Sequence, residues 1–185
     1  MRSDAIRNRE EVLEAAGRLY DAAQDPATVT AAAIAIEAGV GKGTVFRGFG
    51  SLPQLVLALF QRRSDLLFER ISSIDTALPP VDRALLVMSS VLEFKRNNGV
   101  LAAAVEASDG NPYNQAVYAR WHLLLEGLIV EARGHDSADF LAHALLAATR
   151  SELLGHLSPW PDARIWEGIH TLTLSIFAPQ APMTE

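Results

Sequence analysis

The stretch that decides the fold is residues 30–49, TAAAIAIEAGVGKGTVFRGF. It predicts two short helices, the first over residues 31–38, joined by a tight turn. Thr30 stands at the N-cap of the first helix, where its side chain can accept a hydrogen bond from an unpaired backbone N–H. Gly39 can end that helix in a left-handed conformation, and Val40 is predicted to be the buried residue of the turn. Two short helices around a glycine-containing turn are the signature of a helix-turn-helix.

The second helix of this pair, which begins near residue 41, has one apolar and one polar face. Val45 and Phe49 are predicted to face inward, whereas Lys42, Thr44 and Arg47 face outward. The N–H groups at a helix N-terminus attract phosphate, and the side chains that follow can reach base edges in the major groove. The pattern therefore predicts a DNA-binding surface. Its predicted contact residues are Thr30, Lys42, Gly43, Thr44, Phe46, Arg47 and Ser51.

The motif resembles the DNA-binding core of the TetR (tetracycline repressor) family of transcriptional regulators. The resemblance covers residues 8–60 and includes the segment VLEAA at 12–16, Leu19-Tyr20, Gly50-Ser51 and Leu55. It implies a homodimer that binds double-stranded operator DNA, at an inverted repeat, and releases it when a small-molecule effector binds. In this family the effector lies among the middle helices, and the last two helices pair with those of the partner subunit.

The rest of the chain also predicts helices, because its β-branched residues never alternate with polar residues over a useful length. Helices are expected over residues 3–23, 51–75, 81–97, 100–107, 113–133, 137–157 and 163–177, separated by Pro, Gly and Asn signals. The predicted fold class is all-α with about nine helices. A three-helix DNA-binding domain is expected over residues 1–50, and a helical ligand-binding and dimerisation domain over residues 51–185.

Composition is typical of a globular protein without disulfides or membrane spans. The chain has 185 residues, 49% of them hydrophobic, and 0 Cys. Its polar N-terminus and the absence of a long apolar run predict a cytoplasmic protein with no membrane partner. The net charge is −6, and residues 1–50 hold six Lys and Arg against seven Asp and Glu. DNA binding would therefore depend on a local group of cations: the N-terminal arginines with Lys42 and Arg47.

Two groups of residues are predicted to carry the other functions. Aromatic and apolar side chains of the middle helices can line an effector pocket for an apolar or aromatic molecule: Phe68, Met88, Leu92, Phe94, Tyr118, Trp121 and His122. An apolar stripe on the last helix and small residues on the helix before it can form a dimer interface: Leu141, Ala144, Leu145, Ala148, Ile165, Ile169, Leu172 and Ile176.

Departures from the family pattern leave an alternative function open. Phe46 stands where a Tyr is common, and Leu52 where a Lys is common, so one hydroxyl and one cation that could bind phosphate are missing. Gly48 replaces a bulkier residue. The alternative is a degenerate family member that acts as a ligand-binding or interaction module without DNA binding.

The sequence shows no catalytic constellation. The segment GVGKGT at residues 39–44 lacks the first glycine of a phosphate-binding loop, and Gly43 replaces the Ser or Thr that should follow the lysine. His135, Asp139 and His143 have helical i, i+4 spacing, which a metal site would also require. Such residues are more often ordinary polar groups, so no catalytic residue, metal or cofactor is predicted.

Overall fold

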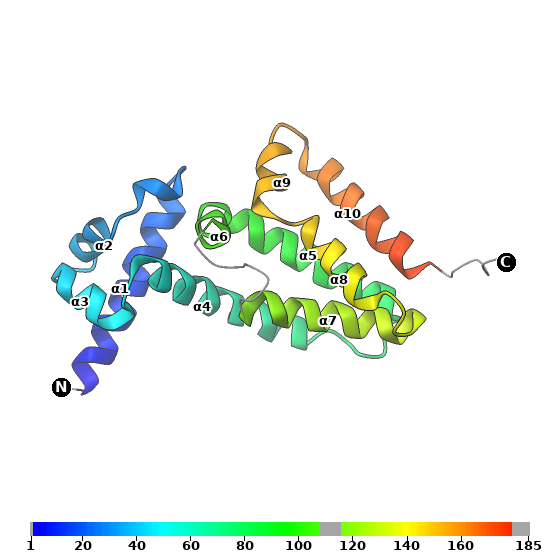
Figure 1. The fold of residues 1–185 in the computed structure, drawn as a ribbon, viewed down its shortest axis with the longest axis horizontal. Helices are drawn as coiled ribbons and strands as arrows, with labels where there is room; N and C mark the ends of the chain where they lie inside the picture. Colours follow the sequence, from blue (N-terminus) through cyan, green and yellow to red (C-terminus); the bar gives the residue numbers. More distant parts are fainter. Residues whose placement is uncertain (1, 108–115, 179–185) are drawn as a thin grey trace. The chain divides into compact units, whose positions relative to one another are not determined.

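The described parts of the chain fold into helices. The computed structural model describes residues 2–107 and 116–178, with side chains from residue 6 onward, and these ranges contain no strand (Figure 1). This confirms the all-α fold predicted from the sequence. None of the described helices is both long enough and apolar enough to span a membrane. The elements are α1 (Arg2–Ala22), the 3-10 helix η1 (Pro26–Thr28), α2 (Ala31–Glu37), α3 (Lys42–Phe49), α4 (Leu52–Ser72), α5 (Pro80–Asn97), α6 (Gly99–Glu106), α7 (Ala116–Arg133), α8 (Ala138–Ala147), α9 (Ser151–His156) and α10 (Asp162–Phe177).

The helices form two compact units. Unit 1 contains Met1–Leu66 and Arg96–Pro112, and unit 2 contains Leu67–Lys95 and Tyr113–Glu185. The helices α4 and α5 each contribute residues to both units. The DNA-binding domain predicted over residues 1–50 lies within unit 1, and its boundary with a ligand-binding domain at residue 51 remains a prediction.

Unit 1 buries the apolar stripe of α1 against the short helices around it. Val12 and Ala16 of α1, Ile34 of α2, Val45 of α3 and Leu55 of α4 are all buried. These positions recur at helical spacing, so each helix hides one face and leaves the other for charged residues. Tyr20 of α1 is also buried, and desolvation raises the pKa of its hydroxyl.

One arginine joins three parts of unit 1. Arg63 of α4 donates hydrogen bonds to Oδ1 and Oδ2 of Asp21 on α1, at 2.7 and 2.8 Å, and to Oδ1 of Asn98 at 2.6 Å. Gly17 of α1 lies under this guanidinium, because a Cβ atom there would come within 2.9 Å of Arg63 Nη2. The bidentate bond to Asp21 fixes α1 against α4, and Asn98 brings the segment before α6 to the same point.

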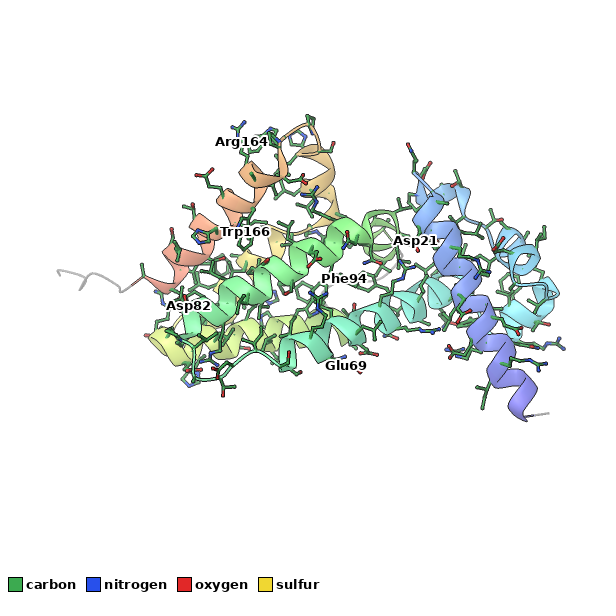
Figure 2. All side chains as sticks on the ribbon, turned by 180° about the vertical axis from the view of Figure 1, so that it is seen from behind. Asp21, Glu69, Asp82, Phe94, Arg164 and Trp166 are labelled. Carbon is green, nitrogen blue, oxygen red and sulfur yellow. The ribbon has the colours of Figure 1, made fainter. Side chains whose placement is uncertain are left out.

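Unit 2 is a bundle built mainly from α5, α7, α8 and α10. Its core includes Met88 of α5, Leu125 and Ile129 of α7 and Leu145 of α8, all of them fully buried. Phe94 of α5, labelled in Figure 2, meets the Trp121 ring edge-on, with ring centroids 5.6 Å apart. Helix α10 packs against α7 and α8.

The helix predicted over residues 137–157 is instead two helices, α8 and α9. The break follows Thr149, whose N–H and hydroxyl both donate to the Leu146 carbonyl oxygen, at 3.1 and 2.9 Å. The next residue, Arg150, has extended backbone angles (φ −64°, ψ 140°). A threonine that bonds its own helix in this way competes with the regular ladder, and the apolar pattern that runs through the break conceals it. The other predicted helices agree with the structure to within a few residues, although residues 113–115 of one of them lie outside the described chain.

Replacing Arg63 by Met should destabilise the protein by about 1–3 kcal/mol, because a charge-assisted bond network around a half-buried guanidinium would lose its donor. The measurement is urea unfolding followed by circular dichroism. Arg62→Met is the matched control, since Arg62 lies next in sequence and makes a single, exposed ion pair with Glu10 at 2.6 Å. Such pairs contribute about 0–1 kcal/mol. Equal shifts of the unfolding midpoint for the two variants would contradict the assignment.

Candidate nucleic-acid interface

The helix-turn-helix is closed by the local bonds that its sequence predicts. Thr30 Oγ1 accepts a hydrogen bond from the Ala33 N–H at 3.2 Å and so caps α2. Gly39 has φ +66°, the left-handed conformation that favours glycine. Val40 is half-buried and not buried as predicted, while its N–H bonds to the Ala35 carbonyl oxygen at 3.0 Å. The backbone of Val40, more than its side chain, therefore closes the turn.

Helix α3 has the two faces that the sequence predicts. Val45 and Phe49 are buried in unit 1, whereas Lys42 and Arg47 are exposed. Arg47 Nη2 donates to Thr44 Oγ1 at 3.3 Å, which lays the guanidinium along the helix. Phe46 is 39% exposed, with Lys42 Nζ 5.8 Å from the centre of its ring. The exposed face of α3 therefore carries two cations and one hydroxyl, beside an aromatic ring that offers a phosphate no hydrogen bond.

The N-terminus of α3 is open to solvent. Its N-cap residue, Gly41, has no side chain that could cap the helix. Gly43 is exposed, and a Cβ atom built on it would meet nothing within 4 Å among the described residues. N–H groups in the first turn of a helix have no partner within the helix, so they can bind phosphate.

Ser51 and Thr30 mark equivalent places at the starts of two helices. Ser51 Oγ accepts a hydrogen bond from the Gln54 N–H at 3.3 Å at the beginning of α4. A hydroxyl that accepts a bond in a cap keeps its own hydrogen as a donor. Both side chains can therefore hold their helix and still donate to a phosphate oxygen.

Arginines of α1 hold α2 and α3 in place. Arg9 Nη1 donates to the Gly48 carbonyl oxygen at 2.5 Å, and its guanidinium lies 4.1 Å from the centre of the Phe49 ring. Arg18 Nε donates to Glu37 Oε1 at 2.7 Å. The sequence pattern places Arg9 among the cations available to DNA, whereas in the structure Arg9 holds the end of α3. Nothing in the local pattern pairs residues 39 positions apart.

Unit 2 contains a cavity of about 400 Å³ between α4, α5 and α7. Its wall is mostly apolar, with Arg83 and Arg120 as charged members. Arg83 is held by Glu131 at 2.5 Å and by the Leu78 carbonyl oxygen at 3.0 Å, and the Arg120 guanidinium lies 3.9 Å from the Phe68 ring centre. The lining residues are Phe68, Ile71, Ser72, Ile74, Thr76, Arg83, Val87, Arg120, Leu123, Leu124 and Leu128.

The structure separates the seven residues predicted to line an effector pocket. Phe68 lines the cavity. Met88, Leu92, Phe94 and Trp121 are buried in the core of unit 2. Tyr118 and His122 are half-buried and stack in a row of rings with His143 of α8. The sequence pattern did not predict most of the cavity wall. Ile74 and Thr76 lie in the loop after α4, and Arg83 and Arg120 are not among the apolar residues by which a pocket was predicted.

The residues predicted to form the dimer interface divide into two groups. Leu145, Ile165, Ile169 and Ile176 are buried within the single chain, where α10 covers α7 and α8. The other four are half-buried and keep part of their surface: Leu141, Ala144, Ala148 and Leu172. The exposed Phe140 of α8 stands four residues before Ala144 and extends the surface of α8, and Leu174 is an exposed apolar residue elsewhere on α10.

Comparison with known proteins agrees with this geometry. No known family model matches the chain. The HTH-type transcriptional regulator SAR0097 of Staphylococcus aureus (strain MRSA252) is 29% identical over 113 residues, which are 60% of this chain and 59% of that protein. The HTH-type transcriptional regulator SAB2452 of Staphylococcus aureus (strain bovine RF122 / ET3-1) is 29% identical over 121 residues, which are 64% of this chain and 65% of that protein. The chain thus spans roughly three fifths of the length of the relatives that it matches.

Solved structures show the same fold over almost the whole chain. A transcriptional regulator from Rhodococcus sp. Rha1 (RHA1_ro04179) superimposes with a TM-score of 0.68 at 18% identity, covering 91% of this chain and 95% of that one. A TetR transcriptional regulator from Rhodococcus sp. RHA1 gives 0.66 at 19% identity, with coverage of 95% and 98%. The multidrug binding protein EbrR, solved with imidazole, gives 0.64 at 20% identity, with coverage of 95% and 98%. The resemblance predicted from residues 8–60 is confirmed: the chain has the fold of TetR-family transcriptional regulators.

Proposed function

We propose that this protein is a homodimeric DNA-binding transcriptional regulator, a repressor that leaves its operator when a small apolar or aromatic molecule binds. The observation that carries the proposal is the exposed face of α3, where Lys42 and Arg47 flank Thr44 on a helix whose other face is buried. Cytoplasmic location and the absence of enzymatic activity belong to the same proposal. They are supported by the regulators that the chain resembles in sequence and in fold.

The proposed mode of binding places α3 in the major groove. Arg47 is long enough for a bidentate contact to guanine, and Lys42 can reach a base or a phosphate. Thr30 and Ser51 would donate to phosphates on either side. Two copies of α3 in a dimer would meet successive major-groove faces about 34–36 Å apart, so the proposed operator is an inverted repeat.

Arg47→Ala should weaken binding to the preferred operator more than binding to random DNA, since a good bidentate contact contributes about 1–3 kcal/mol of discrimination. The measurement compares operator and scrambled duplexes at matched salt by fluorescence anisotropy. Arg62→Ala removes the same charge from α4, where Arg62 is paired with Glu10, and should leave the ratio of the two affinities unchanged. Equal losses on both duplexes would make Arg47 a phosphate contact, and absence of wild-type binding to any neighbouring promoter would favour the degenerate, non-DNA-binding alternative.

Restoring a cation at the start of α4 provides a gain-of-function test. Leu52→Lys should strengthen operator binding and steepen the dependence of log K on log salt by about 0.9 for each subunit, because one more phosphate is neutralised. Leu86→Lys is the control, since Leu86 is an exposed leucine of α5 in unit 2. An identical slope for wild type and Leu52→Lys would mean that the beginning of α4 does not reach the DNA.

The cavity of unit 2 is the proposed effector site. Its size, about 400 Å³, suits a small molecule, and its apolar wall with two guanidinium groups favours an aromatic or aliphatic body bearing a carbonyl or carboxylate. Helix α4 runs without a break from unit 1 into unit 2, so a ligand that prefers one arrangement of α4 can change DNA affinity. That change cannot exceed the difference in the ligand's affinity for the two states.

Leu124→Trp should fill the cavity and abolish both effects of a ligand found by thermal-shift screening of aromatic carboxylates: the rise in melting temperature and the release of DNA. Leu86→Trp adds the same volume on an exposed position outside the cavity and should respond like wild type. A ligand that still stabilises Leu124→Trp would bind elsewhere. A ligand that stabilises wild type but leaves DNA affinity unchanged would remove the coupling.

The proposed dimer interface uses the uncovered surface of α8 and α10. A two-fold interface presents the same residues twice, so one unfavourable side chain enters twice. Ala144→Arg should therefore give a folded monomer, measured by light scattering and circular dichroism. Ala22→Arg, an exposed alanine at the end of α1 in unit 1, should remain dimeric. A dimer of unchanged mass for Ala144→Arg would exclude this face of α8.

A further inference from the structure

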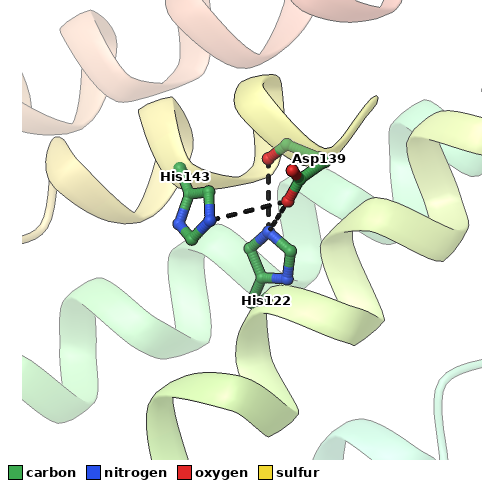
Figure 3. A group of neighbouring side chains, drawn as sticks. All are labelled: His122, Asp139 and His143. Atoms are coloured by element: carbon green, nitrogen blue, oxygen red, sulfur yellow. Dashed lines mark hydrogen bonds and ion pairs between the residues drawn. The ribbon is translucent and has the colours of Figure 1, made fainter. Parts of the chain in front are cut away.

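Two imidazoles and one carboxylate converge on one point between α7 and α8. His122 Nε2 lies 2.9 Å from Asp139 Oδ1, and His143 Nε2 lies 3.5 Å from the same oxygen (Figure 3). The ligand-type atoms of the three side chains all lie within 4.8 Å of one another, and the two imidazole ring centres are 4.1 Å apart. His122 Nε2 also lies 3.2 Å from the backbone oxygen of Asp139.

At these distances the three side chains could bind one shared metal ion after only a small movement of the side chains. Zinc binds imidazole nitrogen at about 2.0–2.1 Å and carboxylate oxygen at about 2.0–2.2 Å. Two ligands of a tetrahedral ion at these bond lengths are therefore roughly 3.3 Å apart, close to the separations of Asp139 Oδ1 from the two nitrogens. Imidazole with carboxylate is a donor set for zinc and other divalent first-row transition ions, whereas magnesium and calcium prefer oxygen alone.

The second nitrogen of each imidazole also faces a partner. His143 Nδ1 and the Tyr118 hydroxyl are 2.6 Å apart, and His122 Nδ1 lies 3.8 Å from Glu126 Oε2. Ligand histidines characteristically point the ring nitrogen that does not bind metal at a carboxylate or another polar group, which fixes the ring and its tautomer. Two carboxylates, Asp139 and Glu126, would offset the charge of a divalent ion.

We propose that His122, Asp139 and His143 form a binding site for a divalent first-row transition-metal ion, with zinc as the reference member of that class. Tyr118 and Glu126 are positioning residues. Asp139 is 73% exposed and His143 is 42% exposed, so an ion can enter from solvent and keep water in its remaining positions. The bound ion joins the middle of α7 to the first turns of α8. This inference is independent of the proposed function, because it concerns metal binding and not DNA.

The three clustered residues differ from the three that helical spacing in the sequence suggests. His135 shares the i, i+4 series with Asp139 and His143, but the cluster in the structure takes its third member from α7. His135 lies before α8, in the segment that ends at Ser137, whose φ of +62° turns the chain into the helix. His135 is consequently a matched control for any histidine of the cluster.

The experiment titrates tag-free, full-length protein, stripped with EDTA and desalted, with ZnCl₂ in a calorimeter and with CoCl₂ in an absorption spectrometer. Wild type should bind one ion per chain in a saturable manner, and Co²⁺ should give visible d–d bands. His143→Ala and the nearly isosteric Asp139→Asn should each lower the affinity at least about 100-fold. Tyr118→Phe, which leaves the ligands in place, should lower it about 10–100-fold, as loss of an outer-sphere partner does.

His135→Ala should bind as wild type does, and metal-free circular dichroism should show every variant folded. Absence of saturable binding by wild type would overturn the site and leave the three residues as an ion-pair network that joins α7 to α8. An equal loss of affinity in His135→Ala and His143→Ala would overturn the assignment of ligands. Unchanged affinity in Asp139→Asn together with His143→Ala would place the ion elsewhere on the protein.

Discussion

The candidate DNA-binding surface depends on the contacts that hold α3 against the rest of unit 1. An eight-residue helix cannot hold its shape alone in water. It persists because Val45 and Phe49 are buried in unit 1 and because Arg9 of α1 bonds to the Gly48 carbonyl while covering the Phe49 ring. The residues that would meet DNA are thus presented by contacts on the opposite face of the same helix. Because these contacts hold α3 in one position, little conformational entropy remains to be lost when α3 binds DNA.

Pairing of charges within unit 1 explains how a chain with net charge −6 can carry a cationic patch on the candidate DNA-binding surface. Acidic side chains of unit 1 are used in pairs that hold helices together: Asp21 with Arg63, Glu37 with Arg18 and Glu10 with Arg62. Lys42 and Arg47 contact residues of α3 itself. Their positive charge is therefore local, and screening within about 10 Å limits how far the acidic residues elsewhere can weaken it.

The apolar residues of unit 2 divide into those that form its core and those that stay on its surface. The isoleucines of α10 are buried on α7 and α8, so the stripe that the sequence shows most clearly stabilises the single chain. Phe140 remains exposed on the face of α8 that carries the small residues Ala144 and Ala148, and Leu174 remains exposed on α10. Exposed apolar residues in a group are typical of a surface that another protein covers. Burial in the monomer thus decides which members of the predicted interface remain available to a partner.

The sequence by itself determined the class of fold, the helix-turn-helix with its Thr30 and Ser51 caps, the left-handed Gly39, and the inward and outward faces of α3. These features are set within three or four residues by helical periodicity and by capping bonds, so they can be read locally. Only the tertiary structure decided that Arg9 holds α3, that Arg63 joins Asp21 to Asn98, and that the cavity wall includes few of the predicted residues. It also divided the helix expected over residues 137–157 and chose His122 over His135 as the neighbour of Asp139. The physical reason is that such pairs join residues 17–42 positions apart, and their meeting depends on how whole helices pack, which short-range periodicity does not encode.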